Sequence, residues 1–333
     1  MKPSALLKTI SCVGYVILVA PWLGHGLSVG IESSFTSKPA SFDQSSRYST
    51  GFYVHIPYCR RRCRYCSFAI VPVGLSTDAE VKQSSFGTIH QQYQSDIFAE
   101  LDMLIRQQRH GKPIKLSSIY FGGGTPSLAP VAMIEGILDR ILKSPFELEE
   151  DAEITMEMDP GTFSLEQLRS LKNLGINRIS LGVQSFDDSI LEAMGRVHRR
   201  SDIMKAIEII HQVFAQDKAN FSIDLISGVP GLTPAKWIAT LETATSLCPS
   251  HLSIYDLQVE EGTVFSTWYK NQRDDQASNT AVGSTISRTF AKIPTLPNEE
   301  AVAFMYKFGA GYLKRKGYEH YEGKFGHDNS NRP

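Results

Sequence analysis

The sequence predicts an α/β fold, a partial (βα)6 TIM-like barrel followed by an incomplete C-terminal region. Six short runs of β-branched and aromatic residues alternate with segments whose apolar residues recur at helical spacing. Strands that alternate with helices form a parallel sheet with right-handed crossovers. Glycines, prolines and polar residues follow these runs, and three cysteines follow the first. Side chains in such places meet at one mouth of a barrel.

The composition is that of an ordinary folded protein. At 333 residues, 42% of them hydrophobic, the chain has enough apolar material for one large domain or two smaller ones. The formal net charge of -1 gives no overall basic field, so nucleic acid is not an expected partner. Three of the five cysteines are clustered, which predicts no disulfide framework and suits a reducing compartment.

The first strand is predicted over Phe52–Ile56, where Pro57 ends it by removing a backbone donor. A loop with the spacing C-x3-C-x2-C follows, with its cysteines at Cys59, Cys63 and Cys66. Three thiolates this close together can converge on one iron–sulfur cluster. A cluster with three protein ligands keeps one iron open to an outside ligand, and this indicates chemistry.

Positive charge surrounds these cysteines and is expected to lower their thiol pKa; it comes from Arg60, Arg61, Arg62 and Arg64. A solvated basic loop is the plainer interpretation of the arginines. For the cysteines, the alternatives are a zinc site completed by His55 and thiols that bind no metal. The spacing favours an iron–sulfur cluster over zinc.

The second βα unit is predicted to carry a ligand-binding turn. A helix is expected from Ile89 to Ile105, and the next strand, Ser118–Phe121, runs into the sequence G-G-G-T-P at 122–126. Glycine lets a backbone approach a ligand closely, because it has no side chain to interfere. A tight turn between strand and helix is the alternative explanation.

Acidic side chains are predicted at the carboxyl end of the third strand. A helix over Val131–Leu142 leads to this strand, 153–160, which carries Glu157 and Asp159 near its end. Carboxylates there face the mouth of the barrel. For Asp159, a solvated loop residue or a helix cap is an equally good explanation.

Helix starts are marked by capping residues. Ser164 and Gln167 are expected to form a capping box, in which each side chain satisfies a free amide of the first helical turn. Thr233 is expected to cap a helix over 234–247 that begins with a proline. Another helix is predicted over Ser201–Phe214.

The remaining strands are predicted over 177–183, 220–230 and 251–257. Gln184 directly follows the first of these. Asp224 stands inside the apolar run of the second, where an unpaired carboxylate would be costly to bury. We therefore expect Asp224 to have a partner.

Three segments are predicted along the chain: a targeting presequence over 1–50, a core barrel over 51–260, and a polar loop and helix over 261–333 that lead into a truncated C-terminal region. Two lysines precede an apolar stretch at 10–31, and a serine-rich tract follows it. This pattern is typical of imported proteins and favours a plastid or mitochondrion, with the cytoplasm as the alternative. Membrane attachment is expected only if the apolar stretch is not cleaved.

The sequence G-F-Y-V-H-I-P-Y-C-R-R-R-C-R-Y-C-S-F at 51–68 resembles the radical S-adenosylmethionine (SAM) enzymes. In that superfamily the three cysteines hold a [4Fe-4S] cluster whose open iron binds SAM, on a barrel of the radical SAM type. Y-V-H-I-P-Y-C looks like the branch that contains oxygen-independent coproporphyrinogen III oxidase and the related heme chaperone HemW. The resemblance extends to Tyr321, after which the H-N-x-x-Y-W segment of that branch is missing.

The resemblance implies roles for particular residues. It makes Cys59, Cys63 and Cys66 the ligands of the cluster. It implies SAM contacts for the residues that match the motifs of the family, which are Tyr53, Gly123, Gly124, Thr125, Glu157, Gln184, Arg196 and Asp224. A solvated basic helix start is the alternative for Arg196, because histidine and further arginines adjoin it. No catalytic side chain beyond these contacts is assigned.

Two functions are compatible with the resemblance. A heme chaperone would bind heme and deliver it to an acceptor protein, whereas an oxidase would decarboxylate the propionate side chains of coproporphyrinogen III. The oxidases carry a fourth cysteine two residues after the third, where this chain has Phe68. This difference favours the chaperone, with heme or a porphyrinogen as the ligand in either case. An inactive relative that no longer cleaves SAM is the third reading, so enzymatic activity stays open.

Overall fold

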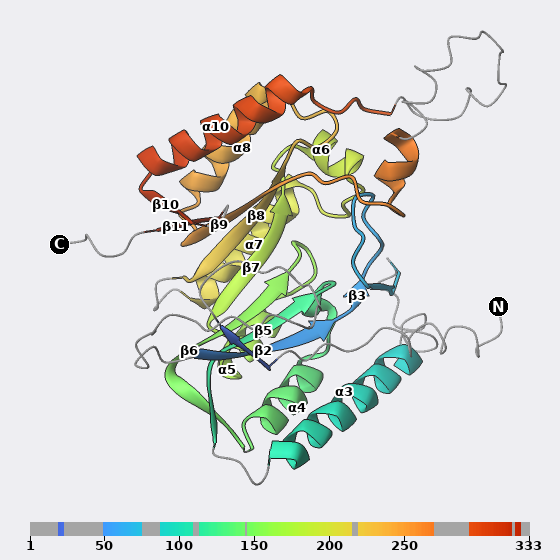
Figure 1. Ribbon diagram of the computed structural model, residues 1–333, viewed down its shortest axis with the longest axis vertical. Helices are drawn as coiled ribbons and strands as arrows, with labels where there is room; N and C mark the ends of the chain where they lie inside the picture. Colours follow the sequence, from blue (N-terminus) through green and yellow to red (C-terminus); the bar gives the residue numbers. More distant parts are fainter. Residues whose placement is uncertain are drawn as a thin grey trace, which may run out of the picture.

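A curved sheet, open at both edges, dominates the computed structural model (Figure 1). The structure describes residues 19–22, 49–74, 87–108, 113–143, 145–214, 219–269, 293–321 and 324–327. Six parallel strands form the sheet in chain order: β2 (Ser49–Ile56), β5 (Ile114–Gly123), β6 (Phe146–Met158), β7 (Arg178–Gln184), β8 (Phe221–Ser227) and β9 (His251–Asp256). This order confirms the predicted partial barrel.

Antiparallel strands extend the sheet at both edges. β1 (Val19–Trp22) pairs with β2 on one side. On the other side β11 (Lys324–His327) pairs with β9, and β10 (Tyr318–Tyr321) pairs with β11. The six parallel strands therefore lie in the interior of a nine-stranded sheet.

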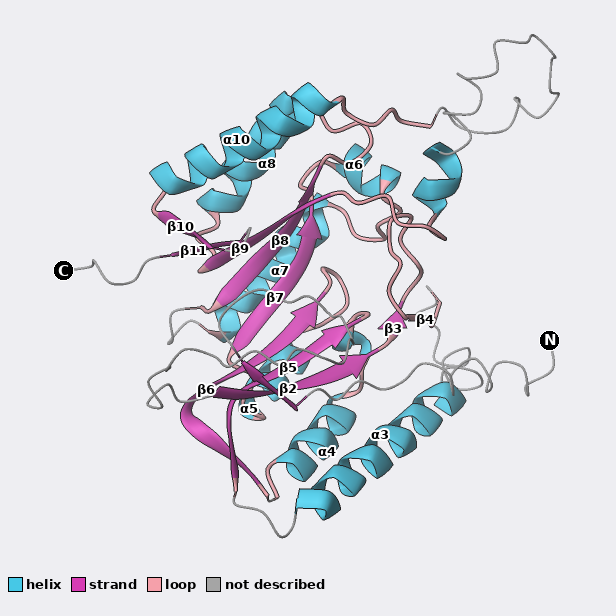
Figure 2. Ribbon diagram, in the orientation of Figure 1, coloured by secondary structure: helices cyan, strands magenta, loops and turns pink. Residues whose placement is uncertain are grey.

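Helices cover the outer face of the curved sheet (Figure 2). The crossover helices are α3 (Gly87–Gln108), α4 (Val131–Ile141), α5 (Leu165–Asn173), α7 (Arg200–Val213) and α8 (Pro234–Ser246), and α10 (Glu299–Arg315) packs beside α8. The four helices with predicted bounds, α3, α4, α7 and α8, begin and end within three residues of the prediction. The sequence did not predict α6 (Asp188–Ala193), a short helix capped by Asp187.

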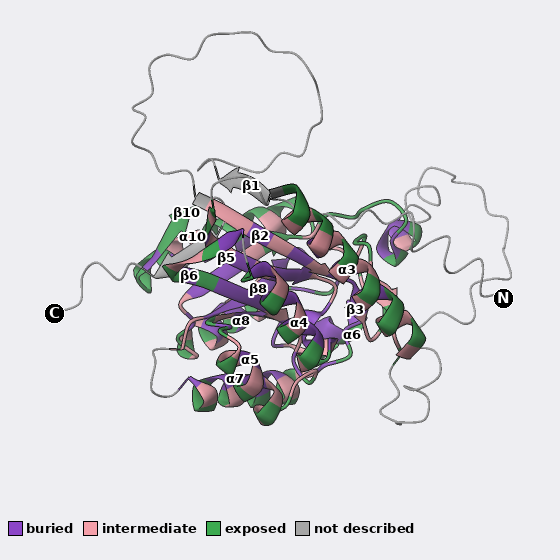
Figure 3. Ribbon diagram, turned by 90° about the horizontal axis from the view of Figure 1, so that it is seen from below, coloured by how far each residue is buried: buried purple, intermediate pink, exposed green. Residues whose placement is uncertain are grey.

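The core lies between the sheet and these helices, and the central strands are buried on both faces (Figure 3). In β7 every residue except the two ends is buried, and in β8 every residue except Asp224 is buried. Continuous apolar runs of this kind belong to parallel strands that are covered on both sides. The few polar groups that interrupt them therefore need a specific explanation.

Two strand starts differ from the predictions. β5 begins at Ile114 and β6 at Phe146, earlier than expected from the apolar runs. The early parts pair with each other, Ile114 opposite Phe146 and Lys115 opposite Glu147, before the register shifts. The acidic segment 149–152 lies within this register shift and has no apolar pattern, so it looks like a loop in the sequence.

Of the two predicted helix caps, one is confirmed and one is half wrong. The Thr233 side chain accepts a hydrogen bond from the Lys236 amide at 3.3 Å, as expected. Ser164 likewise accepts from the Gln167 amide at 3.2 Å. The Gln167 side chain, however, donates to the Ser127 carbonyl at 2.9 Å rather than turning back to the cap. The predicted hydrogen bond from the Gln167 side chain to the cap is thus replaced by a contact with a distant part of the chain.

The predicted presequence lies outside the described residues except for β1 and the start of β2. Residues 274–292 of the predicted polar loop also lie outside them, and 293–295 form neither helix nor strand. Among the described residues, no helix combines the length and the apolar character that crossing a bilayer requires.

Candidate functional site

A cavity of about 450 Å³ opens at the carboxyl ends of the parallel strands. Ten of the eleven predicted site residues line it: Cys59, Cys63, Cys66, Gly123, Gly124, Thr125, Glu157, Gln184, Arg196 and Asp224. Tyr53 does not line it; its ring stacks on Tyr120, and its hydroxyl donates to His55 Nδ1 at 3.2 Å. Their roles as cluster ligands and SAM contacts stay predictions.

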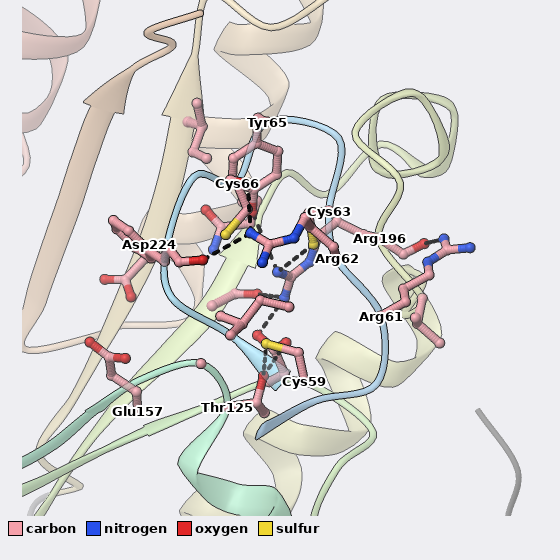
Figure 4. Close-up of a pocket in the computed structure, with 18 of the residues that line it drawn as sticks. Cys59, Arg61, Arg62, Cys63, Tyr65, Cys66, Thr125, Glu157, Arg196 and Asp224 are labelled. Atoms are coloured by element: carbon pink, nitrogen blue, oxygen red, sulfur yellow. Dashed lines mark hydrogen bonds and ion pairs between the residues drawn. The ribbon is translucent and has the colours of Figure 1, made fainter. Parts of the chain in front are cut away.

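The cysteine loop is closed by a small parallel sheet of its own. β3 (Tyr58–Cys59) pairs with β4 (Val71–Pro72), with the Val73 amide donating to the Cys59 carbonyl at 2.8 Å. Figure 4 shows the three thiols on the cavity side of this loop. The loop therefore has a defined shape of its own, and its sulfurs point into the cavity.

The glycine turn lies directly against the start of this loop. A Cβ atom at Gly124 would come within 2.7 Å of the backbone carbonyls of Pro57 and Tyr58. Gly123 has a φ of 115°, and a Cβ there would meet the His55 ring at 2.5 Å. Glycine is thus required at both positions for packing, in addition to any contact with a ligand.

Burial dominates the protonation of the thiols. It raises the pKa of Cys59 to about 12, with the Thr125 hydroxyl as a smaller opposing influence. It also raises the pKa of Cys66, although Arg62 and Arg196 act in the opposite direction. The predicted net lowering of the thiol pKa is therefore wrong for these two cysteines, because the influence of Arg62 on Cys66 is outweighed by burial and no loop arginine is among the main influences on Cys59. A metal that binds here must displace their protons.

The arginines of the loop bind backbone carbonyls. Arg61 donates to the carbonyls of Gly195 and Arg196, each at 2.8 Å, and Arg64 donates to those of Glu192 and Ala193 at the end of α6. Arg60 and Arg62 similarly reach the carbonyls of Gly161 and Phe68. A simple solvated basic loop is therefore wrong for Arg60, Arg61 and Arg64, whose guanidinium groups attach the loop to the barrel. Arg62 is exposed and bonds within the loop. Cations at a helix carboxyl end are also favoured by the helix dipole.

Arg196 is buried, with only 7% of its surface exposed. Its Nη2 atom forms a short ion pair with Asp159 and donates to the Gly182 carbonyl at 3.1 Å. Burial alone would lower the pKa of Arg196, but the Asp159 carboxylate more than offsets this and holds the pKa well above its usual value. Neither Arg196 nor Asp159 is a solvated surface residue.

Two further carboxylates occupy the other side of the cavity (Figure 4). Glu157 accepts hydrogen bonds from the Tyr120 hydroxyl at 2.8 Å and the Gly123 amide at 3.0 Å. Burial, reinforced by the charge of Asp224, nevertheless raises the pKa of Glu157 to about 7. The Ser180 hydroxyl donates to Asp224 Oδ2 at 3.0 Å, which confirms that Asp224 has a partner.

Gln184 has a left-handed backbone, with a φ of 66°. Such a conformation is unusual for a residue other than glycine and is typical of functional sites. It occurs where the register between β7 and β8 shifts, between Leu181 and Gln184. The backbone geometry thus singles out the same glutamine as the family motif does.

Sequence reasoning missed several residues that line the cavity, among them Tyr65, Ser180, His198, Tyr255 and Asp256. Tyr255 and Asp256 end the sixth strand, so the rule that located Glu157 could have found them. His198 accepts from Arg196 Nη2 at 3.4 Å and donates to the Val183 carbonyl at 3.1 Å. Burial, assisted by Arg196, lowers the pKa of His198 to about 4.

The residues fit a cluster better than they fit the zinc alternative with His55. Both ring nitrogens of His55 are engaged, Nδ1 by Tyr53 and Nε2 by the Ala69 carbonyl at 3.0 Å. Within the described ranges, no three His, Cys, Asp or Glu side chains gather closely enough to bind a single metal ion. A four-iron cluster is larger than one ion, and three thiols around a cavity beside a glycine turn suit its size and ligand preference.

Comparison with known proteins agrees with this geometry. The heme chaperone HemW of Synechocystis sp. is 39% identical over 276 residues, which cover 82% of this chain and 58% of that protein. HemW of Escherichia coli is 30% identical over 81% of this chain and 60% of its own length. The Bos taurus protein named radical S-adenosyl methionine domain-containing protein 1, mitochondrial, is 29% identical over 81% of this chain and 52% of its own.

This chain thus spans about six-tenths or less of the length of these relatives. Among solved structures, coproporphyrinogen III oxidase (HemN) from E. coli superimposes with a TM-score of 0.63 at 23% identity, over 84% of this chain and 55% of that one. It has the same fold. The sequence profile of the radical SAM superfamily matches residues 53–244, more than half of the chain. The protein belongs to the radical SAM superfamily.

Proposed function

We propose that this protein is a heme chaperone, which binds heme and delivers it to an acceptor protein. Membership of the superfamily implies a [4Fe-4S] cluster and SAM. The observation that carries the proposal is Phe68, which stands where the oxidases have a fourth cysteine. Its side chain is 66% exposed at the rim of the cavity. Several relatives that match most of this chain are named heme chaperones, in support of the same reading.

The role proposed for each residue follows from its position in the cavity. Cys59, Cys63 and Cys66 would hold the cluster, which supplies an electron for cleaving SAM when both are bound. The carboxylates of Glu157 and Asp224 would attract the cationic groups of SAM from the other side of the cavity. The barrel over 51–260 would contain this entire site, and the loop and helix over 261–333 would follow it.

Heme transfer is the direct test. The full chain, with its cluster reconstituted without oxygen, is incubated with hemin and then with apomyoglobin as a general acceptor. We expect a new Soret band on mixing, followed by transfer of the heme to the acceptor. Absence of a heme-bound spectrum in the iron-loaded protein would contradict the proposal.

The oxidase alternative is tested in parallel with coproporphyrinogen III, SAM and a reductant. We expect no loss of carbon dioxide from the propionate side chains, because the fourth cysteine is absent. Decarboxylated product would make the oxidase the correct assignment. Formation of 5′-deoxyadenosine without porphyrinogen turnover would exclude the inactive relative and leave the chaperone in place.

An organelle is the proposed location, with plastid and mitochondrion as the candidates. The basic, apolar and serine-rich composition of residues 1–50 supports import. A similar mammalian protein carries the word mitochondrial in its name. Sequencing the mature N-terminus from purified organelles tests this. A mature protein that retains residues 1–30 would contradict cleavage after import.

A further inference from the structure

One buried guanidinium group lies against a cysteine of the loop. Arg196 Nη1 donates to Cys63 Sγ at 3.6 Å and to the Tyr65 hydroxyl at 3.4 Å (Figure 4). The other terminal nitrogen, Nη2, is held by Asp159 and by the Gly182 carbonyl. The two terminal nitrogens therefore have different contacts. Nη2 is held in place by Asp159 and the Gly182 carbonyl, and Nη1 contacts the Cys63 sulfur.

The anchor is itself held in place. Thr125 donates from its hydroxyl to Asp159 Oδ2 at 3.3 Å, while Asp159 Oδ1 binds Arg196. A side chain at Gly182 would collide with this pair, because its Cβ would lie 2.7 Å from Asp159 Oδ1. One positive charge is thus positioned by four separate segments. These are the end of β5, the end of β6, the middle of β7 and the segment after α6.

We propose that Arg196 sets the reduction potential of the cluster through the Cys63 sulfur, and that Asp159 is the positioning residue that aims it. Hydrogen bonds to cluster sulfurs and nearby positive charge stabilise the reduced cluster, which carries one more electron. The inference rests on the cluster that the superfamily implies and is independent of heme delivery. It adds a second role to the predicted contact of Arg196 with SAM.

Four proteins test the proposal: wild type, Arg196→Gln, Asp159→Ala and the double variant. Each is loaded with iron, and the midpoint potential is measured without SAM by reductive titration under electron paramagnetic resonance. Arg196→Gln should lower the ratio of reduced to oxidised cluster at a fixed potential at least tenfold, or about 59 mV for one electron. Arg196→Lys, which keeps the charge, should show a smaller shift.

The double variant separates a directed hydrogen bond from net charge. Removing Asp159 and Arg196 together leaves the summed charge of the pair unchanged, so an effect of net charge alone predicts the wild-type potential. We expect the double variant to remain below wild type, because the donor to the Cys63 sulfur is lost. We also expect Arg196→Gln to shift the potential less in the Asp159→Ala background, because the guanidinium group is no longer aimed.

A matched control uses Ser180→Ala. Ser180 lines the same cavity but donates to Asp224 instead, so its loss should leave the SAM-free potential unchanged. A wild-type potential in Arg196→Gln, combined with weaker SAM binding, would reduce Arg196 to a SAM contact and overturn the inference. A wild-type protein that binds no iron would overturn it together with the cluster, whereas failure to bind heme would leave it standing.

Discussion

The two sides of the cavity differ in how their charges are stabilised. On the sulfur side, Arg196 is buried in an ion pair with Asp159, and every contact reinforces its positive charge. On the carboxylate side, Glu157 and Asp224 repel each other, and burial raises the pKa of Glu157 to about 7. On the sulfur side, Asp159 supplies a counter-charge to Arg196, whereas on the other side two carboxylates face each other.

This difference indicates what each side is prepared to receive. The sulfur side suits an anionic group such as a thiolate-bound cluster, because a fixed cation already faces it. The carboxylate side suits a ligand that brings positive charge, because such a ligand would relieve the repulsion. SAM carries an ammonium and a sulfonium group, so the two sides together match a cluster with SAM beside it.

Removing a thiol from the sulfur side should have the largest effect. Cys59→Ala, Cys63→Ala and Cys66→Ala should each abolish stable cluster binding, since two thiolates cannot hold the cubane. Iron analysis and visible absorbance after anaerobic reconstitution measure this. Cys248→Ala is the control, because Cys248 is exposed and lies outside the cavity. Iron content at the wild-type level in all three variants would refute ligation by this loop.

The glycine turn that joins the two sides should be the next most sensitive. Gly124→Ala would place a Cβ 2.7 Å from backbone carbonyl oxygens and should destabilise the protein by about 2–3 kcal/mol. In Gly311→Ala, by contrast, the new Cβ meets only the flexible end of Arg315 at 3.4 Å, within α10. That control should be neutral or slightly stabilising. Urea unfolding of both variants compares them directly, and equal midpoints would contradict the packing argument.

The raised pKa of Glu157 on the carboxylate side should appear as a pH dependence of stability. The native state holds the Glu157 proton more tightly than the unfolded state, so the free energy of unfolding should fall as the pH rises from about 4.5 to about 7. We expect the free energy of unfolding to fall by about 2 kcal/mol, after allowing for the partial exposure of Glu157. The Glu157→Gln variant should not show this pH-dependent fall in the free energy of unfolding. Urea unfolding of the metal-free proteins at pH 5 and pH 8 measures it, and parallel profiles would disprove it.

The smallest expected effect concerns ligand contact without metal loss. Asp224→Ala and Gln184→Ala should each weaken SAM binding about tenfold, or about 1.4 kcal/mol, while iron content stays unchanged. Calorimetry on the iron-loaded proteins measures the affinity. Gln167→Ala is a suitable control, because that side chain is engaged with the Ser127 carbonyl and does not line the cavity. Wild-type affinity in both cavity variants would contradict their assignment as SAM contacts.

Much of this architecture could be predicted from the sequence. The six parallel strands leave apolar runs, and the cysteine and glycine motifs mark the loops that follow two of them. These patterns are local, so reading along the chain is enough to find them. The start of β6 could not be predicted, because the acidic stretch 149–152 falls in a shift of the register with β5 and separates the paired residues 146–148 from the apolar part of the strand.

The contacts within the site were less predictable. Asp159 and Arg196 are 37 residues apart, and nothing in either neighbourhood indicates that they form an ion pair. The contacts of the arginines in the cysteine loop could not be predicted either. Their charge suggests an effect on the thiols, yet their hydrogen bonds go to carbonyls of other segments, and burial decides the pKa of Cys59 and Cys66.

Arg64 holds the cysteine loop from two directions. Its guanidinium group binds the end of α6 and lies over the Trp268 ring at 4.9 Å, while its carbonyl accepts from the Phe265 amide at 3.0 Å. These contacts hold the cysteine loop in place before any metal binds. Binding of the cluster should therefore require little rearrangement of the polypeptide. Hydrogen exchange of the backbone around Arg64 should accordingly be nearly the same before and after cofactor insertion.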